Sequence, residues 1–153
     1  MVIRDWSSDV CSSDLNAALV DATTIENVSI LKGGEDIAVV FIVESQDEIR
    51  MANPEMTLNG QFGSSILKLS GLAYNQTVRL FKDQPNIVAF HFHLPHLANG
   101  RYTISVGIQS VQKDESTGHH WVHDALVLEI LNPSPAYRTG ALAVVPKVTI
   151  ARV

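Results

Sequence analysis

The chain has 153 residues, a formal net charge of −5 and a single cysteine, Cys11. A mildly acidic chain without a basic block is unsuited to the phosphate backbone of a nucleic acid, and one cysteine excludes an internal disulfide and a thiolate metal site. No apolar run approaches the roughly 18 residues of a membrane-spanning helix, and the length suits one domain with a full core.

The first fifteen residues, MVIRDWSSDVCSSDL, differ from the rest of the chain. Three aspartates interrupt every apolar run, which excludes a secretory signal peptide, and the large apolar residues follow neither the period of a strand nor that of a helix. The string from Asp5 to Leu15 resembles the translation of a common short-read sequencing adapter. We therefore expect residues 1–15 to be a non-native segment and the domain to comprise residues 16–153.

Short segments rich in Val, Ile and Phe, bounded by Gly, Pro, Asn and Asp, predict strands along the remaining chain. The expected strands are 24–31, 36–44, 55–59, 65–69, 77–81, 86–94, 101–111, 123–131 and 141–150. Asn53-Pro54 is expected to be a break, and 112–119 to be the polar loop of a hairpin. No segment keeps a helical period. Regularly spaced short strands indicate an all-β protein with an immunoglobulin-like antiparallel β-sandwich.

Two of these strands, 86–94 and 101–111, alternate apolar and polar residues, so the polar side chains of each share one face. We expect the two strands to be neighbours, with Gly107 leaving a shallow place for a ring to approach. Neutral groups that both donate and accept hydrogen bonds suit a hydroxyl-rich ligand, although an ordinary solvated face explains the same pattern. The candidate glycan-binding residues are His91, His93, Thr103, Ser105 and Gln109, with Tyr74 and Asn75 from a neighbouring loop.

The sequence contains no familiar catalytic or phosphate-binding motif. It lacks the G-x-S-x-G nucleophile elbow, the HExxH zinc motif and the G-x-x-x-x-G-K-[ST] phosphate loop. Six histidines raise the question of a metal site, but structural or solvated histidines are the commoner explanation without convergent ligands. We therefore expect neither catalysis nor a cofactor, and we assign no metal ligands.

Three stretches carry a family resemblance. GRYTISVGIQ opens with Gly-x-Tyr and is followed, after a polar loop, by HHWVHDALVLEIL with Trp121 and Asp124. Upstream, LKGGEDIAVVFIVE places Gly-Glu before a long apolar strand, and NPEMTLNGQFGSSILKLSGLAYNQT ends in a Gly-x-x-x-Asn segment, Gly71 to Asn75. In this order, from about Asn16 to Val153, they resemble the C-terminal domain of Wzt-type proteins, the ATP-binding subunits of bacterial ABC transporters that export O-antigen polysaccharide. The chain departs from that pattern at Gln61-Phe62-Gly63, where many members carry an acidic turn, so ligand specificity is not transferred.

The resemblance implies a non-catalytic sandwich that binds the polysaccharide and helps to select it for export. It also implies an ATPase domain upstream in the same polypeptide, a membrane permease as partner, and a cytoplasmic location at the inner membrane. Two alternatives stay open, namely a carbohydrate-binding accessory module of an enzyme and an immunoglobulin-like adhesion or assembly domain. The sequence does not identify the sugar, its linkage or its cap.

Trp121 allows two interpretations. Tryptophan is costly to expose and is often buried at a strand start, so we expect Trp121 to fill the end of the core, with Asp124 capping or pairing with loop backbone. Trp121→Ala would then lower stability by about 3–5 kcal/mol. The alternative is that Trp121 stacks on a sugar ring.

The last predicted strand, 141–150, is too apolar to remain an exposed edge. It can fold back on its own subunit or exchange with a twofold mate. The stiff Pro133-Ser134-Pro135 connector disfavours a tight return, and the family resemblance implies exchange. We therefore expect a homodimer held partly by reciprocal exchange of residues after about Gly140.

Overall fold

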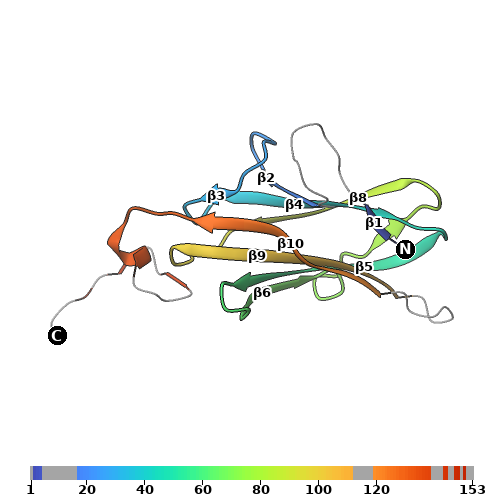
Figure 1. Ribbon diagram of the computed structural model, residues 1–153. Coiled ribbons are helices and arrows are strands. Elements are labelled where there is room, and N and C mark those ends of the chain that lie inside the picture. The colour runs from blue at the N-terminus through green and yellow to red at the C-terminus, as the bar shows by residue number, and fades with distance from the viewer. Residues whose placement is uncertain are drawn as a thin grey trace.

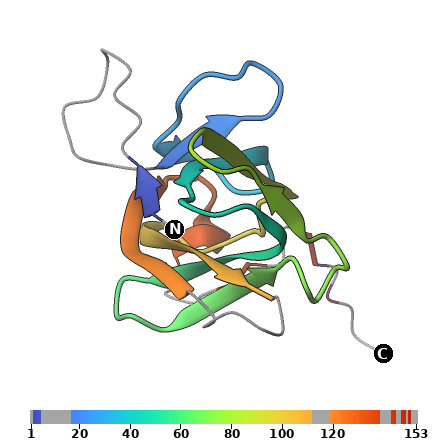
Figure 2. The same cartoon turned by 90° about the vertical axis from the view of Figure 1, so that its right-hand side faces the viewer.

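The computed structural model describes residues 2–4, 17–111, 119–138, 143–144, 147–148 and 150. Figures 1 and 2 show that its strands form two packed layers. The elements are β1 (Val2–Arg4), β2 (Ala17–Asp21), β3 (Ile30–Leu31), β4 (Asp36–Glu44), β5 (Ile49–Gly60), β6 (Ser65–Ser70), β7 (Val78–Leu80), β8 (Pro85–His93), β9 (Gly100–Ser110), β10 (His119–Ile130) and the 3₁₀ turn η1 (Pro135–Arg138).

The two layers are separate hydrogen-bonded sheets. Sheet A is built around β4, which pairs with β8 along its whole length and with β2 and β1 over successive parts. Sheet B has the order β3-β10-β9-β5-β6, with β7 also paired to β5. All strand pairs are antiparallel except the short pairing of β3 with β10. The predicted all-β antiparallel sandwich is therefore confirmed, and no helix in the described part is long and apolar enough to cross a bilayer.

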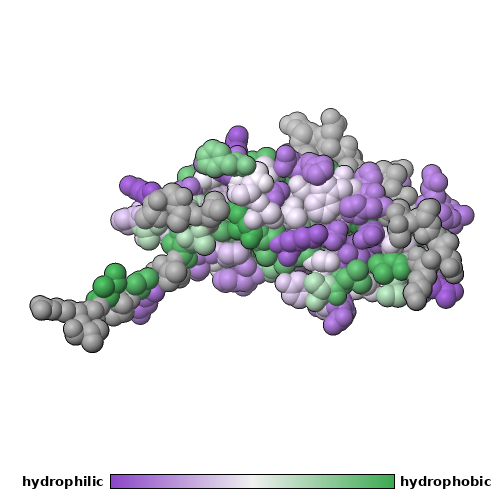
Figure 3. Space-filling view, turned by 90° about the horizontal axis from the view of Figure 1, so that it is seen from below, coloured by the Kyte–Doolittle hydropathy of each residue, from purple (hydrophilic) through white to green (hydrophobic). Residues whose placement is uncertain are grey.

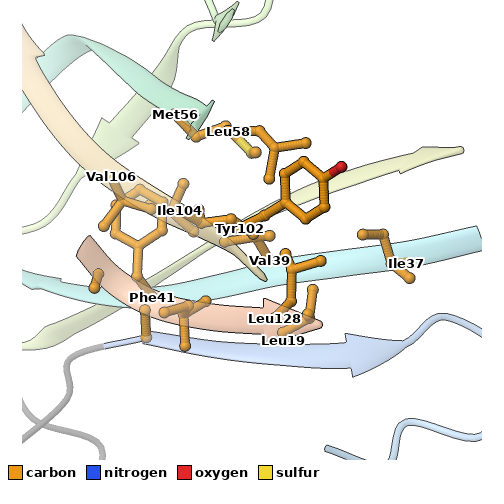
Figure 4. Packing of buried hydrophobic residues seen from close by; sticks show 14 of the residues in the cluster. Leu19, Ile37, Val39, Phe41, Met56, Leu58, Tyr102, Ile104, Val106 and Leu128 are labelled. Carbon is orange, nitrogen blue, oxygen red and sulfur yellow. The ribbon is translucent and has the colours of Figure 1, made fainter. Parts of the chain in front are cut away.

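The core lies between the two sheets and follows the period of two along each strand. Figure 4 shows Leu19, Ile37, Val39 and Phe41 of sheet A opposite residues of β5, β9 and β10 from sheet B. The sheet B residues labelled there are Met56, Leu58, Tyr102, Ile104, Val106 and Leu128. Alternation predicts an inward set for β8 and one for β9. Its members Val88, Leu94, Tyr102, Ile104, Val106 and Ile108 are buried, and Phe90 and Phe92 are partly buried and pack against the core.

Tyr102 is the one core side chain of β9 with a polar end. Its hydroxyl donates to the carbonyl oxygen of Ala98 at 2.6 Å, and burial raises the pKa of the phenol above its usual value of 10.0. A raised folded-state pKa gives stability that is complete below pH 10 and is lost as the pH rises through the folded value.

We expect the free energy of unfolding to fall as the pH rises above about 10 and Tyr102→Phe to flatten that dependence. At pH 7 the variant should lose about 1 kcal/mol, because one buried hydrogen bond disappears. Urea unfolding of both proteins between pH 7 and pH 11 measures the two effects. Equal slopes against pH in the two proteins would contradict this assignment.

Several strands differ from the predictions. The predicted strand 24–31 forms only at Ile30–Leu31, because the Asp21 carboxylate accepts the Thr23 and Thr24 N–H groups in a turn. β2 was not expected, and β5 continues through Asn53-Pro54, which we expected to be a break. The carbonyl of Pro54 accepts the Gly71 N–H at 2.8 Å. Gly71 belongs to the turn between β6 and β7, so on this side Pro54 faces a turn and not a paired strand. A missing N–H costs no ladder bond at that point, which is why proline is tolerated inside the strand.

The chain ends also differ from expectation. Val2–Arg4 form a strand against Ile42–Glu44 of β4, just beyond the part of β4 that β2 covers. The adapter-like residues 5–15 lie outside the described residues. In the predicted last strand, Ala143 makes an isolated antiparallel bridge to Leu97, whereas Val148 and Ile150 are 63% and 92% exposed. Residues 141–142, 145–146 and 149 of this segment fall outside the described residues.

Candidate functional site

The predicted polar face is divided between the two sides of the sandwich. We expected β8 and β9 to be neighbours, but β8 pairs with β4 in sheet A, and β9 lies between β10 and β5 in sheet B. His91 and His93 therefore face outward from sheet A, and Thr103 and Gln109 face outward from sheet B. The expectation of one continuous face is wrong, because alternation defines the inward side of a strand and not the sheet to which it belongs.

The most distinctive feature of the outer face of sheet B is the position of Trp121. Trp121 pairs with Gly107 in the register of β10 and β9, and its ring occupies the space that a side chain at position 107 would fill. A Cβ built on Gly107 would come within 2.0 Å of the indole Cε3 atom. Trp121 is partly buried and outside the core cluster, so the expectation that it fills the end of the core is wrong. β10 begins at His119 and not near His123, which gives Trp121 its outward position.

Two histidines of β10 flank the Trp121 ring. The imidazole of His119 has its centroid 5.9 Å from that of the indole, and the imidazole of His123 lies 6.0 Å away on an edge. The indole N–H donates to Nδ1 of His123 at 3.1 Å. This bond satisfies the indole N–H and places the proton of neutral His123 on Nε2.

A β-bulge follows Trp121 and shapes the surface beside it. Val122 pairs with Val106 and Leu126 with Ile104, so three residues of β10 lie opposite the single Ser105. Asp124, in the middle of the bulge, has a φ of 48°, in the left-handed region that aspartate tolerates better than most residues. Its backbone N–H donates to Oγ of Ser105 at 2.9 Å. The expected contact of Asp124 with loop backbone stays a prediction, because residues 112–118 lie outside the described residues.

These features border a depression on the outer face of sheet B, which we call the Trp121 groove. It has a volume of about 510 Å³. It is lined by Thr57, Asn59, Gly60, Gln61, Gly63, Arg101, Thr103, Ser105, Trp121, His123 and Asp124. Figure 3 views the molecule from this side, and pale and purple atoms of weakly and strongly hydrophilic residues predominate across its middle.

The chemistry of the Trp121 groove is mostly neutral and polar. It combines two threonine hydroxyls, two side-chain amides, an imidazole and one aromatic ring, with Arg101 and Asp124 as charges of opposite sign. The Asn59 amide lies 3.5 Å from the Thr57 hydroxyl, so the groups on β5 already form a hydrogen-bonding row. A surface of this composition suits an uncharged, hydroxyl-rich ligand with an apolar side for the indole.

The predicted residues are distributed over three places. Thr103 and Ser105 lie in the Trp121 groove, although Ser105 is only 2% exposed beneath the bulge. Tyr74 and His91 line a different depression of about 410 Å³, between the edge of β8 and the turn before β7. The other three residues, His93, Gln109 and Asn75, lie outside both depressions. Nδ1 of His93 is 2.9 Å from Oδ1 of Asp36, and Asn75 has a left-handed φ of 56° in its turn.

Sequence reasoning missed most of the Trp121 groove. Thr57 and Asn59 carry a usable signal, because EMTLN alternates and Met56 and Leu58 are its apolar members. The bulge at Asp124 has no comparable signal in the sequence. Among the described residues, no group of three or more His, Cys, Asp or Glu side chains converges to hold a metal ion.

Comparison with known proteins gives a consistent result. Residues 14–144 match the family model described as the Wzt C-terminal domain. The fold is similar to a crystal structure of the C-terminal domain of Wzt, with a TM-score of 0.71 and 13% sequence identity, covering 90% of this chain and 81% of that one. A crystal structure of a putative beta-galactosidase from Bacteroides fragilis has a TM-score of 0.40 and 15% identity, covering 71% of this chain and 16% of that one. No curated protein matches the chain.

Proposed function

This chain belongs to the Wzt C-terminal domain family, and from that premise we propose that it is a non-catalytic domain that binds O-antigen polysaccharide for an ABC transporter. The observation that carries the proposal is the Trp121 groove, in which an aromatic ring lies beside neutral hydrogen-bonding groups on an open sheet face. Ligand sites combine apolar contact area with a few polar groups that fix orientation. The proposed contacts are Trp121, Thr57, Asn59, Thr103 and Asp124, with Ser105 supporting Asp124 from below.

The charges and the shape of the groove support this ligand class. Arg101 and Asp124 offset each other, so the groove has no excess charge that would favour a strongly anionic ligand. An open face accommodates a long chain that crosses it, whereas an enclosed cavity would restrict the ligand to a small molecule. In this proposal the domain works with an ATPase domain upstream in the polypeptide and with a membrane permease, on the cytoplasmic side of the inner membrane.

Trp121→Ala is the experiment that tests the proposed site. We expect the affinity for polysaccharide released by mild acid from the lipopolysaccharide of the bacterium that carries the gene to fall by about tenfold or more, because a central aromatic contact is lost. Since the ring lies outside the core, stability should fall by about 1 kcal/mol, and not by 3–5 kcal/mol. Isothermal titration and urea unfolding measure the two quantities.

His93→Ala is the matched control for this experiment, because His93 is an exposed aromatic side chain on the opposite sheet. It should leave the affinity unchanged. Unchanged affinity in Trp121→Ala, or equal losses in the two variants, would remove the Trp121 groove from consideration. A hydrolase reading frame beside the gene would favour the accessory-module alternative, and a surface-anchoring signal would favour an adhesion domain.

A homodimer is the second part of the proposal. The bridge from Ala143 to Leu97 and the Val144 N–H bond to the His96 carbonyl, 2.7 Å long, tie residues 143–144 to their own subunit. We therefore place the start of the exchanged segment after Val144, later than the Gly140 boundary that the sequence indicated. β8 pairs with a single strand among those described and offers a free edge of nine residues.

A further inference from the structure

We propose that Glu55 and His119 are positioning residues that hold the Trp121 indole in its place against Gly107, ready for ligand. The inference rests on the proposed function for its consequence in binding, but the orientation of the ring can be measured without any ligand. It assigns a role to two residues that do not line the Trp121 groove.

Glu55 and Trp121 lie on either side of Gly107. Gly107 pairs with Glu55 of β5 across one edge and with Trp121 of β10 across the other. The floor beneath the indole is therefore the bare backbone of β9. The His120 carbonyl oxygen, 3.1 Å from an ideal Cβ at position 107, confirms how closely β10 approaches there.

His119 connects Glu55 to Trp121. Its Nε2 atom is 3.5 Å from Oε2 of Glu55, two strands away, so the imidazole reaches across β9 beside the indole. The two ring planes are inclined by 36°, with centroids 5.9 Å apart. His119 thus blocks rotation of the indole toward the β9–β10 loop, and the carboxylate keeps His119 in that place.

His123 restrains the indole on its other side. It accepts the indole N–H and meets the ring edge at an interplanar angle of 67°. Gly107 and a histidine on each side thus restrain the ring from three directions. A pre-organised ring loses little rotamer entropy when the ligand binds, and this reduces the cost of association.

The environment of Glu55 supports a positioning role. Its side chain is 14% exposed, and its other carboxylate oxygen is 3.4 Å from Nζ of Lys68, whose side chain is 58% exposed. Glu55 is the most buried of the three side chains, since His119 is 46% exposed, and this limits the motion of the carboxylate that His119 contacts. Lys68 contacts the same carboxylate from the side away from Trp121, and this provides a control.

The chain has two tryptophans, Trp6 and Trp121. The test therefore uses Trp6→Phe as background, so that all tryptophan fluorescence comes from Trp121. We expect Glu55→Gln and His119→Ala to increase acrylamide quenching of Trp121 fluorescence. Both should weaken binding of the mild-acid-released polysaccharide by about two- to fivefold. Lys68→Gln, which removes the other partner of Glu55, should change neither quantity. Thermal unfolding of each variant checks that the fold is retained.

The outcomes separate this inference from the proposed function. Unchanged quenching in both Glu55→Gln and His119→Ala overturns the positioning role, even if Trp121→Ala abolishes binding. Weaker binding without a change in quenching also overturns it, because Glu55 would then contact the ligand itself. If Trp121→Ala binds normally, the proposed site fails, while the quenching measurements still decide whether the pair orients the ring.

Discussion

Replacing Gly107 by alanine will displace Trp121 and remove polysaccharide binding while the sandwich stays folded. The new Cβ would lie 2.0 Å from Cε3 and 2.6 Å from Cζ3 of the indole, distances that no real contact has, so the ring must leave its place. Alanine suits a strand at least as well as glycine does. We expect the affinity to fall by about tenfold or more, as in Trp121→Ala. Titration and the near-ultraviolet circular dichroism of Trp121 measure the result.

A double mutant tests whether Gly107 acts through Trp121. If the only effect of the new methyl group is to move the indole, Gly107→Ala should add nothing in a Trp121→Ala background. Full affinity in Gly107→Ala, or an equal additional loss in the double mutant, would show that the contact between ring and backbone is not what the ligand requires.

Removing residues 145–153 will convert the proposed homodimer into monomers. Val148 and Ile150 are exposed in the single subunit, and apolar side chains in an extended segment gain most by pairing with a free strand edge. The preceding chain stays anchored, because the Tyr137 hydroxyl is 2.6 Å from Nδ1 of His96 and the Asn99 N–H donates to the Tyr137 carbonyl oxygen. The shortened domain should therefore keep its fold. Sedimentation velocity at high micromolar concentration measures the change in mass.

A substitution in the intact chain provides the control for the truncation. Changing Val148 and Ile150 together to aspartate keeps the length but removes the apolar contacts, and it should also give monomers. An intact domain that is monomeric at high micromolar concentration, or a truncated one that stays dimeric, would rule out exchange of this segment without affecting the sandwich fold.

Hydrophobic alternation predicted the inward residues of the strands well but not how the strands are arranged. The boundaries of β4, Asp36–Glu44, follow from a continuous apolar run of a central strand. The buried alternate residues of β9 follow from alternation, because a half-buried strand must alternate. The same pattern does not say whether β8 lies beside β9 or β4, since either arrangement buries the same side chains. The pairing of β8 with β4 depends on contacts between residues far apart in the sequence. This pairing places His91 and His93 on the opposite sheet from Thr103 and Ser105.

The candidate site was only partly predictable for a related reason. Gly107 and Trp121 were both recognised as unusual, but their partnership requires the register of the hairpin, which the polar loop between them does not fix. With β10 beginning at His119, the two residues meet directly. Composition at the strand start favoured burial of Trp121, whereas a glycine on the neighbouring strand allowed the ring to be partly covered on the outer face.

The length of the bulge in β10 bears on how this surface can change during evolution. Three residues of β10 lie opposite the single residue Ser105, so the bulge contains two extra residues. Because two is an even number, Leu126, Leu128 and Ile130 point inward as they would in a strand without the bulge. Loss or gain of a residue pair at Asp124 would leave that apolar row pointing into the sandwich. A single insertion or deletion would need a bulge of another class to keep the row facing inward, and without one the row would turn toward solvent. Changes of two residues are therefore the simplest way for the wall of the groove to vary in length.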